Sequence, residues 1–453
     1  MRLPAETPGR LRLLAAGVGV LAAVWALVLV VETRQARTGV TVLSQSRAPV
    51  VRAASDLYFA LNDMDAQLAN VLLVGDDTGL GVTRSQALDI FERRRVQGDA
   101  DVQEVAAAVS DPAGARDIRG LLDGLGRYEA LAAEVLLRPR ADAVTAYRSA
   151  TDLLRLTLLP LARDLADGQA RTLEAGYAAE RSRARATLAA TAVLGGLLLV
   201  LLLVTQLYLT RRFRRLVNPA LAAASLLVLG MLAASVLVEG VHLQRLRTAK
   251  SDAFDSLLVL EQARAVSYDA NADESRYLLD PQRSEQYERA FQAKTQQLVD
   301  VGADSLAVFD QRLDAAVAAY RRDRSRVGWN GYLGSEFRNI TFPGERAAAE
   351  LALDRYREYQ ADDRRIRQLA GSGQRRAAVA LCTSYAPGGS NYAFDRFDTA
   401  LTSVITINED VFRTASRADR DTLTAWWLVP AGGALAVLVL LVLGVRPRLG
   451  EYR

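Results

Sequence analysis

The stretch Arg211-Arg212-Phe213-Arg214-Arg215-Leu216-Val217-Asn218-Pro219 lies near the middle of the 453-residue chain and sets the topology expected for the rest. It separates two uncharged runs, residues 186–209 and 219–238. Each run, as a helix, is long enough to cross the roughly 30 Å hydrocarbon core of a bilayer. Four arginines within five residues cannot lie in lipid, and short arginine-rich loops stay in the cytoplasm. The stretch therefore predicts a cytoplasmic hairpin between two membrane spans.

Two further apolar runs, residues 13–31 and 422–445, complete a set of four. The first run is longer than the core of a usual signal peptide. Val31-Glu32-Thr33-Arg34 offers no small-x-small cleavage site after it, so we expect an uncleaved anchor. Arginines precede the first run and follow the last one. We therefore expect a multi-pass plasma-membrane protein with both termini in the cytoplasm.

The two long segments between the spans have the periodicity of helices. In the first, apolar residues recur through Leu57, Leu61, Leu68 and Leu72, and strand signals are lacking. Breaks predict helices over about residues 33–74, 82–109, 112–138 and 141–185, which would pack as an up-down-up-down bundle. In the second segment we expect helices at both ends and a glycine- and aromatic-rich loop over residues 327–334 and 339–346.

The predicted fold is an all-α membrane protein with four transmembrane helices and two extracytoplasmic helical-bundle domains arranged as a tandem repeat. The expected order is a cytoplasmic N-terminus (1–12), first span (13–31), four-helix bundle (32–185), second span (186–209), cytoplasmic arginine hairpin (210–218), third span (219–238), second bundle with an inserted loop (239–421), fourth span (422–445) and cytoplasmic tail (446–453).

The tandem repeat is predicted from two independent offsets. Residues 63–73 and 269–279 share the pattern Asp-x-[Asp/Asn]-Ala-x-x-[Ala/Ser]-x-x-Leu-Leu at an offset of 269 − 63 = 206. The spans 13–31 and 220–238 are offset by 220 − 13 = 207. Agreement within one residue favours duplication of one unit made of a span, a helical segment and a span.

The polar positions of the repeated motif are the first candidate binding residues. At helical spacing Asp63 shares a face with Gln67, and Asp269 shares one with Asp273 and Arg276. Two interpretations stay open: a solvated face beside a bundle core, or a face that meets a ligand or a partner. The candidate partner-binding residues here are Asp63, Asp65, Asp269, Asn271 and Asp273.

Two other stretches are candidate docking surfaces. The loop over residues 336–346 mixes acidic, arginine and aromatic residues with Gly and Pro, as interfaces do, although a structured connector would also explain it. The hairpin arginines could dock a cytoplasmic protein, or only fix topology and touch anionic lipid headgroups. The candidates are Glu336, Asn339, Phe342, Glu345 and Arg346 outside, and Arg211, Arg212, Arg214 and Arg215 inside.

Composition argues against catalysis. One cysteine excludes an intrachain disulfide and a cysteine-based metal site, and one histidine excludes a cluster of histidine ligands. That histidine, His242, lies just after the third span, where an ordinary interfacial residue is expected, which argues against a Ser-His-Asp triad. There is no phosphate-binding glycine loop or HExxH motif, so we expect no catalytic residue, cofactor or metal and no enzyme activity. A net charge of +4 gives no case for nucleic acid. The uncharged spans argue against a transporter.

The four-span layout, together with Asn339-Ile340-Thr341-Phe342-Pro343-Gly344-Glu345-Arg346 and Ser390-Asn391-Tyr392-Ala393-Phe394-Asp395, resembles the actinobacterial GlnX-type membrane proteins over nearly the whole chain. That family works between an extracytoplasmic amino-acid-binding lipoprotein, GlnH, and a cytoplasmic Ser/Thr protein kinase, PknG. The resemblance implies a signal adaptor that relays the availability of aspartate, glutamate or glutamine from such a lipoprotein to such a kinase.

Other functions stay open at this stage. The helical segments also resemble the four-helix-bundle sensors of chemoreceptors, so the protein could bind a small molecule directly and need no binding protein. An envelope scaffold subunit is a third possibility, and a homo-oligomer is compatible with each. The expected cytoplasmic segments are too short for an output domain, so signalling would require a separate partner, with membrane lipid around the spans.

Overall fold

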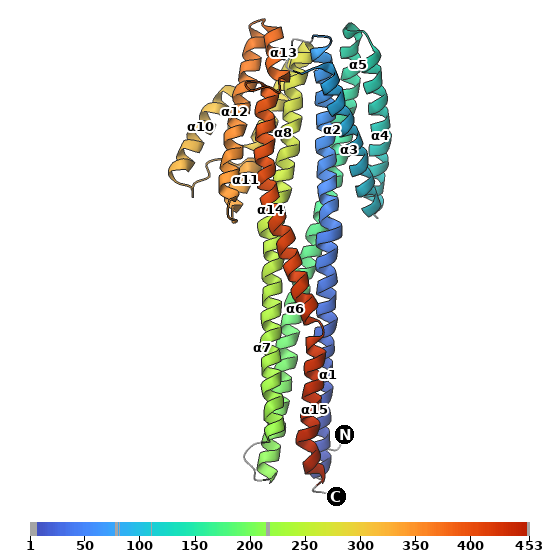
Figure 1. The fold of residues 1–453 in the computed structure, drawn as a ribbon, viewed down its shortest axis with the longest axis vertical. Coiled ribbons are helices and arrows are strands. Elements are labelled where there is room, and N and C mark those ends of the chain that lie inside the picture. The colour runs from blue at the N-terminus through green and yellow to red at the C-terminus, as the bar shows by residue number, and fades with distance from the viewer. Residues whose placement is uncertain (1–6, 78–79, 81, 110, 214–217, 451–453) are drawn as a thin grey trace. The chain divides into compact units, whose positions relative to one another are not determined.

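The computed structural model describes residues 7–77, 80, 82–109, 111–213 and 218–450. Within these residues all regular secondary structure is helical, apart from one isolated β-bridge between Asp300 and Asn330 (Figure 1). The predicted all-α class is confirmed for the described part of the chain.

The helices follow one another with short connections. The first part of the chain contains α1 (Thr7–Val42), η1 (Leu43–Arg47), α2 (Ala48–Val74), α3 (Arg84–Ala108), α4 (Pro112–Leu137), α5 (Arg140–Leu153), η2 (Leu154–Leu158) and α6 (Leu159–Phe213). The second part contains α7 (Pro219–Arg247), η3 (Thr248–Phe254), α8 (Asp255–Leu279), η4 (Pro281–Arg283), α9 (Ser284–Leu298), α10 (Leu306–Arg322), α11 (Gly331–Asn339), α12 (Glu345–Gly371), α13 (Arg375–Thr383), α14 (Ser390–Trp426) and α15 (Val429–Gly450). The segments η1, η2 and η3 are π-helical, and η4 is a 3₁₀ turn.

Helices α3 and α4 begin where local capping chemistry places them. Thr83 and Gln86 form a capping box at the start of α3, in which each side chain bonds the other residue's backbone N–H. Asp111 accepts hydrogen bonds from two backbone N–H groups at the start of α4, and Pro112 occupies the first helical position. These ends match the predicted helices 82–109 and 112–138 closely.

The predicted loop over residues 327–334 is wrong in its second part, because α11 begins at Gly331. Leu333 and Phe337 lie one helical turn apart and are both buried. The Phe337 ring packs 5.1 Å from the Trp329 ring and 5.2 Å from the Tyr320 ring, measured between centroids. Burial of this aromatic group stabilises a short helix whose glycine content would otherwise disfavour it.

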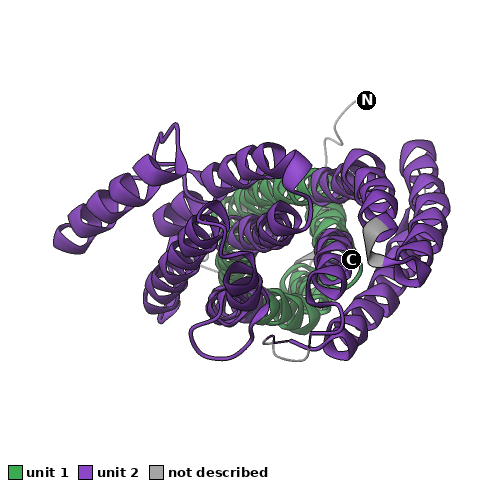
Figure 2. Ribbon diagram, turned by 90° about the horizontal axis from the view of Figure 1, so that it is seen from above, with its two compact units in different colours: residues 1–46, 174–249, 413–453 green, residues 47–173, 250–412 purple. Residues whose placement is uncertain are grey.

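The chain divides into two compact units, the first built from three stretches of sequence and the second from two (Figure 2). Unit 1 contains residues 1–46, 174–249 and 413–453, and unit 2 contains residues 47–173 and 250–412. In unit 2 the two segments predicted to be extracytoplasmic bundles share one hydrophobic core. That core includes Leu57, Leu121 and Tyr147 from the first segment and Leu278, Ile366 and Cys382 from the second.

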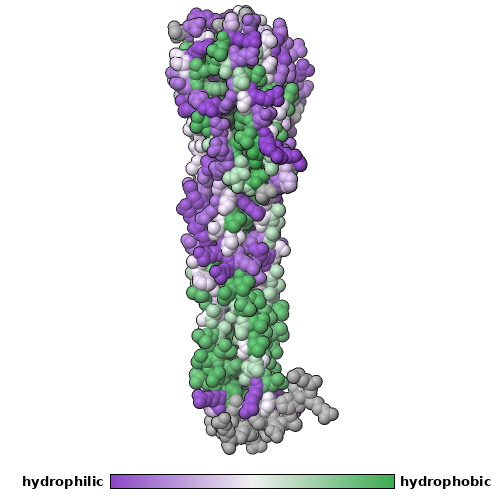
Figure 3. All heavy atoms as spheres, turned by 90° about the vertical axis from the view of Figure 1, so that its right-hand side faces the viewer, coloured by the Kyte–Doolittle hydropathy of each residue, from purple (hydrophilic) through white to green (hydrophobic). Residues whose placement is uncertain are grey.

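Unit 1 holds the four apolar stretches. Their inward residues form a second core, which includes Val18, Trp25, Leu198, Val228 and Val437. Many of their other residues are exposed, and Figure 3 shows hydrophobic residues gathered on the surface of this unit. Four helices of the described chain are long and apolar enough to cross a membrane, which indicates a membrane protein. The side on which the termini lie stays a prediction.

Two glycines allow close approach between the apolar helices. A Cβ on Gly195 of α6 would lie 2.8 Å from a Leu232 methyl carbon of α7 and 3.1 Å from the Trp25 ring of α1. A Cβ on Gly433 of α15 would overlap the Met231 side chain of α7. These glycines therefore serve helix packing, as small residues in apolar helices commonly do.

Candidate functional site

Asp65 lies at the centre of a buried polar network in unit 2. Its carboxylate accepts hydrogen bonds from the hydroxyl groups of Tyr128 (3.2 Å), Tyr147 (2.9 Å) and Thr151 (2.8 Å). The Arg276 guanidinium of α8 donates two more, from Nε at 2.9 Å and Nη2 at 2.7 Å. Side chains of α2, α4, α5 and α8 thus meet at one carboxylate. Its desolvation is offset by five hydrogen bonds.

The same arginine joins Asp65 to the acidic residues of α8. Arg276 Nη1 donates to Asp273 at 2.7 Å and to Asp269 at 3.1 Å. Lys294 of α9 contacts both of these carboxylates, 2.7 Å from Asp269. Burial alone would raise the pKa of Asp269, but Lys294 and Arg276 outweigh it and lower that pKa to about 2. With three carboxylates and two cations, the network carries one net negative charge.

The expectation of a solvated polar face is wrong for this motif. Asp65 and Asp273 are fully buried, because α2 and α8 pack against each other and neighbouring helices cover them. Asp63 lies outside the network and pairs with Arg94 of α3 at 2.6 Å. Asn271 is buried elsewhere on α8. The structure therefore brings together three of the five candidates and separates the other two.

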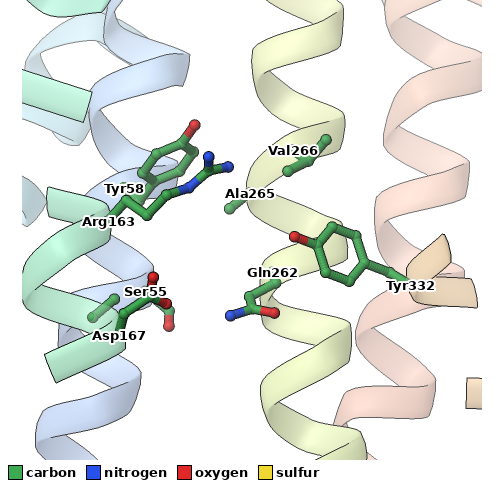
Figure 4. Close-up of a pocket in the computed structure, with 9 residues that line it drawn as sticks. Ser55, Tyr58, Arg163, Asp167, Gln262, Ala265, Val266 and Tyr332 are labelled. Carbon is green, nitrogen blue, oxygen red and sulfur yellow. The ribbon is translucent and has the colours of Figure 1, made fainter. Parts of the chain in front are cut away.

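A cavity of about 260 Å³ opens between helices of both halves of unit 2 (Figure 4). Gln262 of α8 and Tyr332 of α11 reach toward it from one side, and Arg163 and Asp167 of α6 lie opposite. Burial raises the pKa of Tyr58, which keeps its phenol neutral. The polar residues that line this cavity are Ser55, Tyr58, Arg163, Asp167, Gln262 and Tyr332.

A second cavity of about 280 Å³ adjoins the first, since both are lined by Tyr58 and Arg163. Arg155 and Asp164 also line it, and so do Asp269 and Lys294. Asp269 and Lys294 belong to the buried network, so the network borders this cavity. A ligand in this cavity would contact Asp269 and Lys294, which also take part in the ion network at the centre of unit 2.

Several charged side chains of the two cavities are unpaired. In the described residues, no carboxylate lies within ion-pair distance of Arg155 or Arg163, and no cation lies so close to Asp164 or Asp167. The guanidinium of Arg163 lies over the Tyr58 ring, 5.6 Å from its centroid. The cavities therefore present both positive and negative groups that can bind a ligand.

The loop over residues 339–346 is held by internal contacts. Glu345 is buried and accepts the backbone N–H groups of Thr341 at 2.7 Å and Phe342 at 2.9 Å, while Asn408 Nδ2 donates to it at 2.7 Å. Asn339 Nδ2 donates to Ser256 Oγ at 2.9 Å. These contacts favour the structured-connector interpretation for the loop.

The other candidates of this loop have internal contacts or are covered. Arg346 donates to the Tyr320 hydroxyl at 2.8 Å, and Phe342 is half-buried. Glu336 is buried, and burial together with the charge of Glu345 raises its pKa to about 8. The carboxyl groups of Glu336 and Glu345 are thus closed to a partner in this conformation.

The arginine hairpin is described only in part. Helix α6 continues to Phe213, so Arg211 and Arg212 lie in its last turn rather than in a loop, and Arg211 is exposed. Arg214 and Arg215 lie outside the described residues. Their role as a docking surface stays a prediction.

Among the residues that line the cavities, sequence reasoning named Asp269 and missed the others. Tyr58, Arg163 and Asp167 follow no common spacing, because they come from two helices that are far apart in the chain. The shared face of Asp269, Asp273 and Arg276 was a usable signal. An arginine on the same helix face as two aspartates indicates an internal ion network as well as a polar surface.

Residues 39–178 match the family model described as the actinobacterial sensor domain. No curated protein and no solved structure shows a significant match to the chain. The matched segment contains Asp65 of the network and Tyr58, Arg163 and Asp167 of the cavities. This family description concerns sensing and not catalysis. The match therefore supports an actinobacterial sensor protein, with its sensor segment at residues 39–178.

Proposed function

We propose that the protein is a membrane sensor that binds a small zwitterion, of the amino-acid class, directly in the two adjoining cavities of unit 2. The observation that carries the proposal is the presence of unpaired guanidinium and carboxylate groups in one continuous lining. The sensor-domain match over residues 39–178 supports a sensing role.

The lining offers a partner for each end of an amino acid. The planar guanidinium of Arg163 suits a carboxylate, which it can bind through two parallel hydrogen bonds. Asp164 or Asp167 suits an ammonium group, and Gln262 and Tyr332 add neutral donors and acceptors. Volumes near 260–280 Å³ lie just below the usual range of about 300–1,000 Å³ for small-molecule sites, which favours a compact ligand.

The buried network supplies a route from ligand binding to helix packing. Asp269 and Lys294 touch both the cavity and the Arg276 network. A charged ligand group beside them would change the balance of a network that holds α2, α5 and α8 together. Such a ligand shifts the conformation only if it binds one arrangement of these helices better than another.

Calorimetry of the full-length detergent-solubilised protein with individual amino acids tests the proposal. Arg163→Gln removes a charged hydrogen-bond donor worth about 1.5–3 kcal/mol, so affinity should fall roughly 10- to 100-fold. Asp167→Asn should act similarly, whereas Arg321→Gln in the exposed Arg321–Asp354 pair should leave affinity unchanged. Absence of binding at millimolar concentrations, or equal affinity in both cavity variants and the control, would refute direct sensing.

Relay to partner proteins is a second proposal. It rests on the resemblance to the GlnX-type proteins and on the exposed position of Arg211 at the end of α6. In it, an amino-acid-binding lipoprotein docks on residues 239–421 and a Ser/Thr kinase docks on residues 210–218. Crosslinking in the native host, with and without added glutamate or aspartate, followed by mass spectrometry, should recover both partners. Recovery of neither under any condition would leave the self-contained sensor.

A further inference from the structure

The single histidine of the chain occupies a buried position in unit 1 that the proposed function does not use. His242 lies on α7, shortly after the apolar stretch 219–238, and is only 1% exposed. Its Nδ1 atom lies 2.8 Å from Asp419 Oδ2 of α14. Its Nε2 atom lies 4.0 Å from Glu180 Oε1 of α6. One imidazole ring therefore stands between carboxylates from two other helices.

The ring and the carboxylates on both sides of it have atoms without a hydrogen-bond partner in the described residues. Within the described residues, His242 Nε2, Glu180 Oε1 and Asp419 Oδ1 have no hydrogen-bond partner, and all three atoms are buried. The other oxygen of Glu180 accepts a hydrogen bond from Arg183 Nη1 at 2.7 Å. A buried nitrogen facing a buried carboxylate oxygen at 4.0 Å is a place where one proton can be shared after a small movement.

Every helix of this unit that packs here contributes a charged group. Glu32 of α1 accepts from Thr187 Oγ1 at 3.3 Å, and Glu239 is buried on α7 beside His242. Arg245 of α7 donates to the Ala418 carbonyl of α14 at 2.7 Å. The groups that face the ring or its carboxylates are Glu32 (α1), Glu180 and Arg183 (α6), Glu239 and Arg245 (α7) and Asp419 (α14). Acidic groups outnumber basic ones in this set.

The two protonation states of His242 differ in one helix contact and not in the other. The neutral ring can donate from Nδ1 to Asp419, but it then presents the lone pair of Nε2 to the Glu180 carboxylate. The imidazolium donates from both nitrogens, so it keeps the bond to α14 and gains an attraction to α6. Protonation therefore changes the α6–α7 contact and leaves the α7–α14 contact in place.

We propose that His242, Asp419 and Glu180 form a proton-binding site that clamps α6 to α7 when the imidazole is charged and releases α6 when it is neutral. Burial lowers the pKa of His242, but the hydrogen bond to Asp419 and the charges of Asp419, Glu239 and Glu180 outweigh it and raise that pKa. A raised pKa stabilises the clamped state below neutrality, and this stability is lost as the pH rises through the folded-state pKa.

Nuclear magnetic resonance can read this site directly, because one histidine gives one set of ring signals. The full-length protein, purified without a histidine tag and labelled with ¹³C- and ¹⁵N-histidine, is titrated in detergent. We expect an apparent pKa above the ordinary value of about 6.5 and, above it, nitrogen shifts of the Nδ1–H tautomer. An apparent pKa at or below about 6.5 would overturn the proposal.

Two variants separate a proton clamp from a plain structural His–Asp pair. Glu180→Gln should lower the apparent pKa of His242 by about 1 or more, because it removes a facing charge within about 4 Å. Arg183→Gln should raise it, because it removes a cation from Glu180, and this exposed arginine is the safer change for folding. The control variant Glu358→Gln changes an exposed carboxylate of unit 2 and should leave the pKa unchanged. Unchanged pKa values in both Glu180→Gln and Arg183→Gln would overturn the clamp and leave only the bond to Asp419.

Discussion

Replacing Arg276 with methionine removes the guanidinium that holds three carboxylates together in unit 2. Arg276 is fully buried and bonds Asp65, Asp269 and Asp273. Methionine keeps most of the volume, so the substitution leaves little cavity and acts mainly through charge. Lys294 would then be the one cation of the network, and it contacts Asp269 and Asp273 but not Asp65.

The expected cost follows from breaking a buried ion pair on one side. Removal of one partner typically destabilises by about 3–5 kcal/mol, because the other charge stays buried without compensation. For a domain of this size that corresponds to a melting temperature lower by about 6–10 °C. Circular dichroism at 222 nm during heating of the detergent-solubilised protein measures the shift. The control Arg321→Gln breaks an exposed pair and should cost about 0–1 kcal/mol.

A double variant sharpens the test. Asp65→Asn alone leaves Arg276 with one fewer charge partner, so it should destabilise the wild-type protein. In the Arg276→Met background it removes a charge that has become uncompensated, so it should cost less there. A melting temperature for Arg276→Met equal to that of Arg321→Gln, or strictly additive effects of the two network substitutions, would refute the reasoning.

Two further pairs of substitutions test other parts of unit 2. Burial raises the pKa of Glu336 to about 8, so the folded state keeps a proton that the unfolded chain, with a pKa near 4.3, has released by pH 8. The stability that this group contributes is complete below about pH 4 and is lost as the pH rises toward about 8. Glu336→Gln should therefore raise the melting temperature at pH 8 and hardly change it at pH 4.5. The control Glu285→Gln, at an exposed position, should show no such difference between the two pH values. A gain of the same size at both pH values would contradict this. A Cβ on Gly331 would lie 2.6 Å from the Gln297 carbonyl oxygen at a φ of +77°, so Gly331→Ala should cost about 1–3 kcal/mol. Gly126→Ala in α4 meets open space and should instead stabilise by about 0.5–1 kcal/mol, and melting temperatures that move in the same direction would argue against both accounts.

The elements that could be predicted are those determined by neighbours in the sequence. The four apolar helices follow from the uncharged runs, and the starts of α3 and α4 follow from the capping residues Thr83 and Asp111. Such signals act within a few residues and need no knowledge of the rest of the fold. Helix α11 was missed because its stability comes from contacts of Phe337 with rings outside the helix.

The candidate site was predictable only in fragments. The motif at residues 63–73 and 269–279 marked Asp65 and Asp273 as unusual polar positions, but the meeting of Asp65 with Arg276 joins residues 276 − 65 = 211 apart. Helical spacing tells which residues share a face and not which other helix covers that face. The cavity residues Tyr58 and Arg163 are joined by packing alone, and they had no local signal.

The π-helical segment η2 sets the rotational phase between two parts of unit 2. A π-turn holds one residue more than the α-helical turn it replaces, and one residue corresponds to about 100° around a helix axis. Before η2, Tyr147 and Thr151 point to the network, and after it Arg163 and Asp167 point to the cavity. A chain shorter by one residue at the exposed position Leu156 would keep the first pair in phase and turn the second pair away. The number of residues in η2 thus decides whether side chains before it can reach the network while side chains after it reach the cavity.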